Sequence, residues 1–421
     1  MDIPRLRSDN SATYSNDHQL FGWQENITMA GNLPSEITAP PRDRRLISLD
    51  ALRGFDMFWI IGGTVIVAAA ADATGWHWLA AFRDEMRHTE WNGFTPYDLI
   101  FPLFLFIAGV AMPFSFKKRI AHGASKAELY RHVIIRGLVL VLLGMIYNGL
   151  LKFDWATMRY PSVLGRIGLA YMFAGLIVLN TSVRGRIVWL VGLLVGYWAA
   201  MKFIPVPGFG AGDLAPGHNL ADYIDGKLLP GVLLHPVAHP PTGVVDTALR
   251  DPEGILSTIP AIGTALAGVL TGQLLKSERS SGYTKTLWMV VAGLMSLSLA
   301  LLWNNNFPIN KNLWSSSFVL YCAGWSLLLL AAFYLVIDVW HFRAWTLPLV
   351  VIGSNSILIY MSQKFIDFGY TAHFFFDGVL KYIAPYKYTA PYQPLLLAIA
   401  VVVVEWFMLY LLYRKRIFLR V

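Results

Sequence analysis

Long apolar runs alternate with short polar segments along most of this chain. Each run has about 18 to 24 residues, enough for a helix to cross the roughly 30 Å hydrocarbon core of a bilayer. The runs do not alternate apolar and polar residues with a period of two, as a transmembrane β-barrel requires. The pattern predicts an all-α polytopic membrane bundle with ten helices, near residues 51–72, 97–116, 131–151, 162–180, 186–204, 256–275, 284–303, 315–337, 345–366 and 394–414.

The composition agrees with a chain surrounded by membrane lipid. Of the 421 residues, 56% are hydrophobic and 14% are charged, whereas about a quarter of the residues of a soluble protein are charged. The formal net charge of +8 does not indicate nucleic acid, because the Lys and Arg residues cluster in short loops. The single cysteine, Cys322, lies in an apolar run, which excludes an internal disulfide and a thiolate metal site.

The distribution of basic residues predicts the orientation of the chain. Under the positive-inside rule, the basic loops and both termini face the cytoplasm. The segment 205–255 contains only Lys227 and Arg250 and is predicted to be a long outer loop, which either caps a site or is a plain connector. The basic loops contain Arg42, Arg44 and Arg45; Lys117, Lys118, Arg119, Lys126 and Arg131; Arg184 and Arg186; Lys276, Arg279 and Lys285; and Arg414, Lys415, Arg416 and Arg420.

Two regions of different character follow from the same pattern. Residues 1–45 are polar, rich in Ser, Asn, Asp and Pro, and contain no apolar core of the signal-peptide kind. They are predicted to be a disordered cytoplasmic tail. Residues 46–421 are predicted to form the ten-helix membrane domain.

A polar turn from His88 to Asp98 leads directly into the second predicted span, on the outer side. Imidazole exchanges a proton near neutral pH without special tuning, which suits acyl transfer. In the same turn, Trp91 offers a flat stacking face, Asn92 offers an amide, and Asp98 precedes the next helix. The turn is therefore either a catalytic site or an ordinary polar loop at the membrane interface.

Several ionisable residues fall inside the predicted spans, where a charge costs at least about 2.5 to 3.5 kcal/mol. Asp50, Arg53 and Asp56 open the first span, either as a salt-linked helix start or as a contact for phosphates. Arg136, one turn into the third span, is a candidate for binding a nucleotide phosphate. Arg166, near the outer start of the fourth, either pairs with Asp98 or contacts an outer substrate. Snorkelling to the interface is the alternative for both arginines.

The last two predicted spans also contain polar residues. The run 353–356 places small and amide-bearing residues inside a helix, and Gln363 follows two turns later, which indicates hydrogen bonds between helices. Glu405 is either part of a structural pair or a proton-relay candidate. The outer-loop residues His218, His235 and His239 lack acidic or cysteine partners at a suitable spacing, so no metal is expected.

Several sequence blocks in the same order carry a resemblance to a known family. The chain resembles the membrane-bound heparan-α-glucosaminide N-acetyltransferases and their bacterial relatives over most of residues 45–415. The blocks are Arg45-Leu46-Ile47-Ser48-Leu49-Asp50-Ala51-Leu52-Arg53-Gly54, His88 to Gly109, Val163-Leu164-Gly165-Arg166-Ile167-Gly168, Pro252-Glu253-Gly254-Ile255-Leu256-Ser257-Thr258-Ile259-Pro260 and Pro348-Leu349-Val350-Val351-Ile352-Gly353-Ser354-Asn355-Ser356.

The resemblance implies transmembrane acetyl transfer. Acetyl-CoA would bind from the cytoplasm as the donor, and the amine of a terminal glucosamine would be acetylated on the outer side. The active-site histidine of the family matches His88, and the resemblance further implies a homodimer in a bacterial inner membrane. The family has an asparagine toward the outer end of its first span, where this chain reads Ile61-Gly62-Gly63-Thr64. Either Thr64 or Asn92 takes over that polar contact, or this branch acts differently.

The leading hypothesis assigns roles to the residues of the outer turn. Neutral His88 takes a proton from the amine of an amino sugar as the nitrogen attacks the thioester, with an acetyl-His88 intermediate as a variant. Asp98 orients the imidazole, Asn92 hydrogen-bonds the sugar or the carbonyl oxygen, and Trp91 packs on the pyranose ring. The predicted substrate contacts also include Thr64 and Arg166, and the predicted donor contacts are Arg53 and Arg136.

A transporter is the alternative from a different functional class. An inner-membrane permease for N-acetylglucosamine or a related saccharide would line its path with aromatic and amide side chains. Transporters often contain helices broken near mid-membrane. The residues that favour such breaks here are Pro102, Gly109, Pro260 and Gly263.

Overall fold

The computed structural model describes residues 46–233, 235–239, 244–383 and 390–419. Residues from Leu46 onward form one compact unit. The predicted disordered tail, residues 1–45, lies outside the described residues. An all-α polytopic membrane protein is confirmed, since nine segments of the described chain are long and apolar enough to cross a membrane.

The chain folds into long apolar helices, several of which begin with a serine cap, and a number of shorter helices. They are α1 Ile47–Phe58, α2 Thr64–Thr74, α3 His77–Glu85, α4 Ile100–Ala121, α5 Lys126–Tyr147, α6 Val163–Asn180, α7 Val183–Phe203, α8 Leu220–Leu228, α9 Thr258–Lys276, α10 Gly282–Asn304, α11 Ser316–Tyr334, α12 Leu347–Ser354, α13 Ser356–Phe365, α14 Phe368–Ile383 and α15 Gln393–Arg414. Two antiparallel pairs of short strands accompany them, β1 Pro205–Val206 with β2 Gly210–Ala211 and β3 His235–His239 with β4 Val244–Arg250.

The first span is longer than predicted and is distorted near its middle. A π-helical turn, Trp59–Gly63, joins α1 to α2, so the span covers Ile47–Thr74 rather than 51–72. Gly62 has φ 158°, which favours glycine, and a Cβ there would overlap the Val402 side chain. The distortion leaves the carbonyl of Ile61 available, and the Gln363 amide donates to it at 3.3 Å.

The ninth predicted span, 345–366, is wrong as a single helix. It is divided at Asn355 into α12 and α13, so the run 353–356 does not lie inside one helix. The Asn355 side chain instead binds the backbone beyond α15: its amide donates to Ile417 O at 3.0 Å, and Leu419 N–H donates to its carbonyl oxygen at 2.9 Å. Hydrogen bonds to the backbone of Ile417 and Leu419 therefore take the place of helical hydrogen bonds at Asn355.

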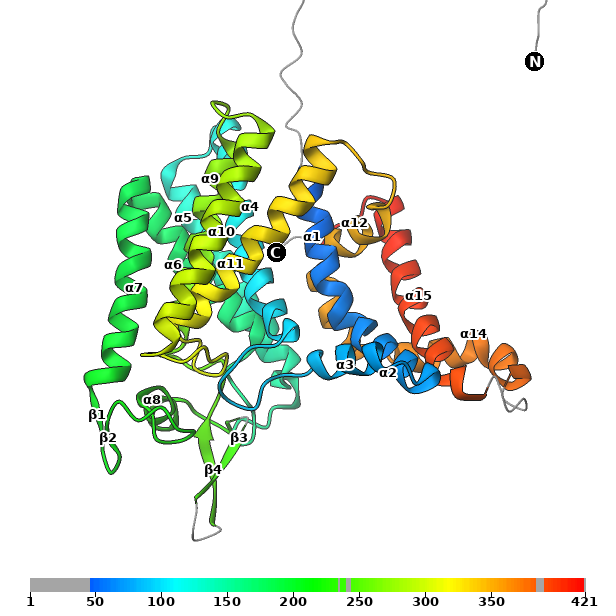
Figure 1. Cartoon of the computed structure of the whole chain (residues 1–421), viewed down its shortest axis with the longest axis horizontal. Helices are drawn as coiled ribbons and strands as arrows, with labels where there is room; N and C mark the ends of the chain where they lie inside the picture. The colour runs from blue at the N-terminus through cyan, green and yellow to red at the C-terminus, as the bar shows by residue number, and fades with distance from the viewer. Residues whose placement is uncertain (1–45, 234, 240–243, 384–389, 420–421) are drawn as a thin grey trace, which may run out of the picture. The chain divides into compact units, whose positions relative to one another are not determined.

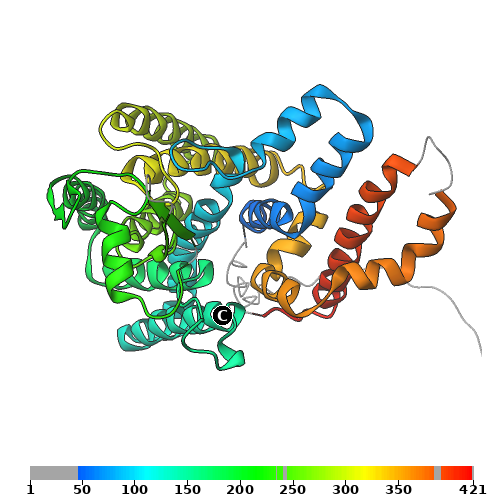
Figure 2. The same cartoon turned by 90° about the horizontal axis from the view of Figure 1, so that it is seen from below.

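The helices form two sets, visible in Figure 1. In one set α4, α6, α7 and α11 pack around α9, α5 packs on α6 and α10 on α11; in the other, α1 packs on α12, and α15 contacts α2, α12 and α14. Figure 2 shows the blue α1–α3 segment beside the orange and red α14–α15 segment. Contacts of α1 with α4 and α11 join the two sets through a buried apolar cluster that includes Leu52, Phe106 and Leu330.

The residues expected to break helices lie in unbroken ones. Pro102 and Gly109 are inside α4, and Pro260 and Gly263 are inside α9. Gly109 serves close packing, because a Cβ there would overlap the Ala265 carbonyl of α9. Small residues of this kind let membrane helices approach closely.

The two ends of the bundle differ in content. At one end the turn that contains His88 meets the segment 205–255, since Trp91 Nε1 donates to Leu214 O at 3.1 Å; Figure 1 shows α8 and the strands at this end. We call it the His88 end. At the other end Lys117, in the last turns of α4, lies 3.6 Å from Glu278, so the basic end of α4 meets the loop that follows α9 there. Helix α4 runs between the ends over about 33 Å, at 1.5 Å per residue.

Candidate functional site

Asp98 is held by its own turn at the start of α4. The one-turn 3₁₀ segment Pro96–Leu99 begins with a capping box between Thr95 and Asp98. The Asp98 side chain is 0% exposed, and its Oδ2 accepts hydrogen bonds from Thr95 N–H at 3.2 Å and Thr89 N–H at 3.4 Å. Local sequence therefore buries a carboxylate and fixes its direction.

His88 takes the other oxygen of this carboxylate. Its Nδ1 lies 2.7 Å from Asp98 Oδ1, and its ring packs on Tyr97 with 4.6 Å between the ring centroids. Because the carboxylate oxygen only accepts, Nδ1 carries the hydrogen and Nε2 of neutral imidazole is left as an acceptor. The His88 side chain is 52% exposed. The structure thus places a buried carboxylate against an accessible imidazole. The roles of orienting group and base for this pair stay predictions.

Lys311 is a third member of this site, which sequence reasoning missed. Its Nζ lies 2.8 Å from His88 Nδ1, 3.0 Å from His88 Nε2 and 3.4 Å from Asp98 Oδ1. Burial lowers the pKa of Lys311, and the charges of Asp98 and Glu253 oppose this shift. The signal in the sequence was a lysine in a predicted outer loop, where the positive-inside rule disfavours basic residues.

A rigid turn before α11 carries Lys311. Asn310, 1% exposed, accepts from Leu313 N–H at 2.9 Å and donates through its N–H to Ser315 Oγ at 3.1 Å. The Asn310 amide also donates to Asn92 Oδ1 at 3.0 Å. Asn92 itself is exposed. This bond fixes the amide of Asn92 beside the His88 turn and leaves its NH₂ group available.

Trp91 is partly enclosed by residues of the long connecting segment. The guanidinium carbon of Arg250 lies 4.6 Å from the indole ring centre, and Trp91 packs within a cluster that includes Tyr197 and Leu220. One face of the ring is therefore covered by a cation. A sugar that stacks on Trp91 must use the remaining part of its surface.

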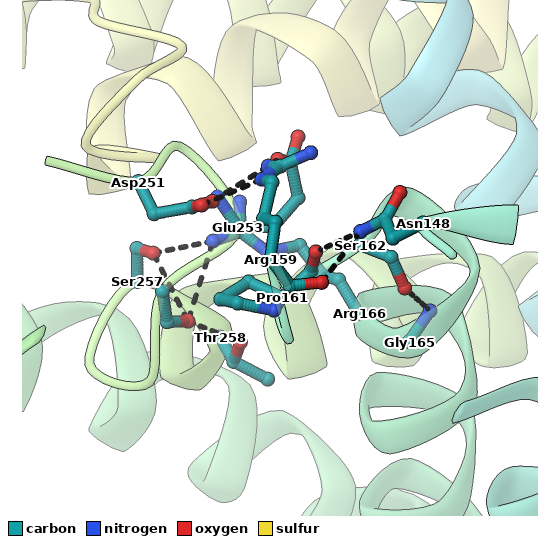
Figure 3. Close-up of polar contacts among 11 residues, drawn as sticks. Asn148, Arg159, Pro161, Ser162, Gly165, Arg166, Asp251, Glu253, Ser257 and Thr258 are labelled. Atoms are coloured by element: carbon teal, nitrogen blue, oxygen red, sulfur yellow. Dashed lines mark hydrogen bonds and ion pairs between the residues drawn. The ribbon is translucent and has the colours of Figure 1, made fainter. Parts of the chain in front are cut away.

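A network of charged residues lies beside the His88 turn, at the starts of α6 and α9 (Figure 3). Arg159 binds Asp251 through two hydrogen bonds of 2.7 Å and also pairs with Glu253. Burial opposes the charged form of Arg159, but the hydrogen bonds and charges of Asp251 and Glu253 raise its pKa above the ordinary value. Asn148 supports the same segment by donating to the backbone oxygens of Arg159 and Pro161.

Arg166 belongs to this network and does not pair with Asp98. It is 2% exposed, donates to Ser257 Oγ, and its guanidinium carbon lies 4.9 Å from the ring centre of Trp314. The backbone N–H of Trp314 donates to Lys311 O at 3.0 Å, so Arg166 contacts the turn that carries Lys311. The Nε and Nη1 atoms of Arg166 have no hydrogen-bond partner within the described ranges.

Two buried acids of α8 lie beneath the network. Asp225 accepts from Ile255 N–H at 2.8 Å, and Asp222 accepts from the Asn219 amide at 2.7 Å. Burial raises the pKa of Asp225 to about 7 and that of Asp222 to about 6. A Cβ on Gly254 would overlap the Asp225 carboxylate, so only glycine fits at this close approach.

The predicted donor contacts lie elsewhere in the fold. Arg53 pairs with Asp50 at 3.6 Å rather than with Asp56, and neither carboxylate oxygen of the buried Asp56 has a hydrogen-bond partner in the described part of the chain. Because α5 begins at Lys126, Arg136 lies nearly three turns into the helix rather than one, and its guanidinium carbon is 4.6 Å from the Tyr171 ring centre. Thr64, a predicted substrate contact, donates from its Oγ1 to Trp59 O within its own span, at 3.5 Å.

Two hollows lie away from the His88 turn. One, about 510 Å³, is at the start of α5 among Arg119, Arg131 and His132. The other, about 430 Å³, is lined by Gln363 and Glu405. Glu405 is 1% exposed and accepts from the Gln363 amide at 3.0 Å, while its Oε2 has no hydrogen-bond partner among the described residues.

The outer-loop histidines are treated differently by the structure. His218 bonds Asp213 at 3.0 Å, whereas the side chains of His235 and His239 lie outside the described residues. Among the side chains that are described, no group of three or more His, Cys, Asp or Glu residues could hold a metal ion.

Comparison with known proteins gives this site a family context. Residues 45–210 match the family described as "Domain of unknown function (DUF5009)". The chain is 29% identical over 429 residues to heparan-alpha-glucosaminide N-acetyltransferase of Homo sapiens, covering 91% of this chain and 60% of that protein. It is 31% identical over 326 residues to the Mus musculus protein of the same name, covering 67% of this chain and 49% of that protein. The chain belongs to the heparan-alpha-glucosaminide N-acetyltransferase-like family. It spans about half to three-fifths of the length of these curated relatives.

The family match covers the residues that the sequence nominated. The matched stretch, 45–210, includes the His88 turn and all the predicted site residues, which are Arg53, Thr64, His88, Trp91, Asn92, Asp98, Arg136 and Arg166. Lys311 lies outside that stretch. In this member of the heparan-alpha-glucosaminide N-acetyltransferase-like family, the His88 site is therefore completed by a residue from the second half of the chain.

Proposed function

We propose that this chain transfers the acetyl group of acetyl-CoA, bound from the cytoplasm, to the amine of an amino sugar on the outer face of the membrane. The single observation that carries the proposal is the His88 and Asp98 pair, an exposed imidazole oriented by a fully buried carboxylate. The curated relatives named N-acetyltransferases support acyl transfer as the reaction class. The name of those relatives supports a glucosamine-type acceptor.

His88 is proposed to act as the general base. Its Nε2 takes a proton from the acceptor nitrogen as that nitrogen attacks the thioester carbon, and Asp98 stabilises the imidazolium that forms. The new C–N bond replaces the C–S bond, and the proton leaves with the CoA thiol. In a two-step variant His88 itself carries the acetyl group. Asn92, fixed by Asn310, offers its free NH₂ group to the acyl oxygen or to the sugar.

The proposed orientation uses the two ends of the bundle. The basic loops lie at the end opposite the His88 turn, which supports a cytoplasmic position for those loops and an outer position for His88. We place the protein in a bacterial inner membrane with both termini inside, as a homodimer. The donor would enter near Arg136 and the basic hollow at the start of α5, where cations can bind phosphates.

A saccharide transporter is a second candidate, favoured by one observation. The first and ninth predicted spans are interrupted at Gly62 and Asn355, and discontinuous helices commonly surround substrate sites in transporters. Thermal unfolding distinguishes the two functions, because a ligand that binds the folded state raises its stability. Stabilisation by acetyl-CoA supports the enzyme, whereas stabilisation by N-acetylglucosamine alone supports the transporter.

A vesicle assay tests the proposed reaction and its direction together. Purified protein is reconstituted into sealed vesicles loaded with labelled acetyl-CoA, and glucosamine is added outside. Labelled N-acetylglucosamine should form outside only in vesicles whose protein has its basic loops inward. Absence of product in vesicles that still bind acetyl-CoA would contradict the proposal.

A further inference from the structure

Lys311 places a primary amine against the proposed base. Its Nζ is closer to the two ring nitrogens of His88, at 2.8 and 3.0 Å, than to Asp98 Oδ1, at 3.4 Å. A lysine serving only as the counter-ion of Asp98 would approach the carboxylate most closely, at about 2.7 to 2.9 Å. The Nζ atom instead lies against the imidazole, 3.0 Å from Nε2, the ring nitrogen that carries no hydrogen while Nδ1–H is directed to Asp98.

The surroundings favour a reactive amine at this position. The Lys311 side chain is only 16% exposed, and burial lowers its pKa, which increases the fraction of free amine. The charged groups that face it are His88, Asp98 and Glu253, and the buried thiol of Cys322 lies on α11. Desolvated lysines of this kind are recognised nucleophiles in enzymes.

Hydrogen bonds hold the backbone of the turn that carries Lys311 in one conformation. Asn310 is locked by hydrogen bonds to Leu313, Ser315 and Asn92, and Trp314 N–H donates to Lys311 O. Trp314 is 1% exposed. The Nζ atom is therefore presented to His88 by a fixed backbone.

We propose that Lys311 occupies the place of the acceptor amine and is itself acetylated when donor is present without acceptor. The inference rests on the proposed acetyl transfer and adds a modification site to it. The Nζ–C bond forms at the thioester carbon and the C–S bond breaks. Of the two protons lost by the ammonium, one passes through His88 to the CoA thiolate and the other goes to solvent. The product, a neutral amide beside His88, blocks the site.

The test compares lysines within one protein. Full-length protein in lipid nanodiscs is incubated with acetyl-CoA, and acetylation of each lysine is followed by peptide mass spectrometry. Lys152 and Lys227, which are exposed, report uncatalysed acetylation. Since a positioned base contributes about a hundredfold or more, Lys311 should react about a hundred times faster than either control. Added glucosamine should slow the reaction at Lys311 only.

Two variants separate the catalysed reaction from background chemistry. His88→Gln should reduce acetylation of Lys311 to the rate of Lys152 while leaving the controls unchanged. Lys311→Arg keeps a positive charge but no acetylatable amine, so preincubation with acetyl-CoA should inactivate the wild type and not this variant. Each protein is compared with its own sample kept without donor, and a melting curve confirms that the variants fold.

The outcomes distinguish failure of the inference from failure of the proposed function. Acetylated glucosamine with unmodified Lys311 overturns the inference and leaves acetyl transfer standing. Lys311 acetylation at the rate of the controls, or unchanged in His88→Gln, also overturns it. If neither glucosamine nor Lys311 is acetylated by protein that binds acetyl-CoA, the proposed function fails and the inference fails with it.

Discussion

His88 Nδ1 lies 2.7 Å from Asp98 Oδ1, although the imidazole is 52% exposed and the carboxylate is 0% exposed. This asymmetry assigns the roles within the pair. The buried partner is fixed by Thr89 and Thr95. The exposed partner directs its second nitrogen, Nε2, toward an amine, that of Lys311 at 3.0 Å. A structural ion pair needs no exposed member, so the arrangement favours proton transfer by His88.

Replacement of His88 by Gln should abolish acetyl transfer. Glutamine keeps a hydrogen-bonding group toward Asp98 but cannot accept and release a proton, so kcat should fall by about 10²- to 10⁴-fold. The measurement is initial rate with labelled acetyl-CoA and glucosamine.

His218→Gln is a matched control for that variant. His218 also pairs with an aspartate, Asp213, at 3.0 Å. In the described part of the chain it has no hydrogen bond to His88, Asp98 or Lys311. Its activity should stay near that of wild type. Full turnover by His88→Gln would remove His88 from the mechanism.

Asp98→Asn should lower both stability and activity. The amide cannot accept from His88 Nδ1 and Lys311 as a carboxylate does, and it leaves the Lys311 charge buried without its counter-ion. Breaking a buried pair costs about 3 to 5 kcal/mol. Thermal unfolding with and without acetyl-CoA measures this cost. The control is Asp213→Asn, which changes a more exposed pair and should cost under about 1 kcal/mol. Equal losses in the two variants would contradict the larger cost expected for the buried Asp98.

The local part of the site was predictable and its distant part was not. His88, Asn92 and Asp98 lie within one turn, and Pro96 and Asp98 at a helix start are recognisable local signals. Lys311 is 223 residues from His88 along the chain, and its approach depends on the packing of α11 against the start of α4. Nothing in the spacing of residues specifies that contact. Similarly, Arg159 meets Asp251 only through the fold.

For the membrane spans too, local features were predictable and features that depend on distant contacts were not. Apolar length identified the helices well, because crossing a bilayer imposes it on each segment. The interruption at Asn355 depends on backbone groups of Ile417 and Leu419, more than 60 residues away, so periodicity missed it. The sequence did contain a hint, since the run Gly353 to Ser356 favours helix poorly.

Arg159→Met should destabilise the His88 end of the bundle. The change removes two hydrogen bonds to Asp251 and the pair with Glu253, and leaves two neighbouring acids without the cation that binds them directly. The loss should fall toward the lower end of the roughly 3 to 5 kcal/mol expected for a buried pair, because Arg159 is partly exposed. Arg159→Lys should recover part of this loss but not the paired bonds to Asp251. Unchanged melting in Arg159→Met would show that the network contributes no stability.

Arg136→Ala should weaken binding of acetyl-CoA without changing the pH dependence of turnover. If the guanidinium contacts a donor phosphate, its loss removes a charge-assisted hydrogen bond of about 1.5 to 3 kcal/mol, or roughly 10- to 150-fold in Kd. Calorimetry on protein in nanodiscs measures this. Arg184→Ala, at an exposed arginine in the first turn of α7, is the control. Equal affinity in the Arg136 variant and the wild type would place the donor elsewhere.

Asp225 should make the protein less stable as the pH rises. Burial raises the pKa of Asp225 to about 7 from its ordinary 3.8, so between these values the unfolded carboxyl is ionised while the folded one keeps its proton. Unfolding then releases a proton, and the free energy of unfolding falls with rising pH until about pH 7. Asp225→Asn removes this contribution while its side-chain oxygen still accepts from Ile255 N–H.

Melting temperatures of wild type and Asp225→Asn between pH 5 and about 8 test this linkage. The wild type should lose stability relative to the variant as the pH rises, and groups that titrate in both proteins cancel in the difference. Asp222, whose pKa burial raises to about 6, stays in both and leaves part of the slope. Asp213→Asn is the control, because the hydrogen bond from Ala215 N–H lowers the pKa of Asp213 and moves its contribution below this window. A constant difference between wild type and Asp225→Asn would show that Asp225 is ionised in the folded protein throughout this pH range.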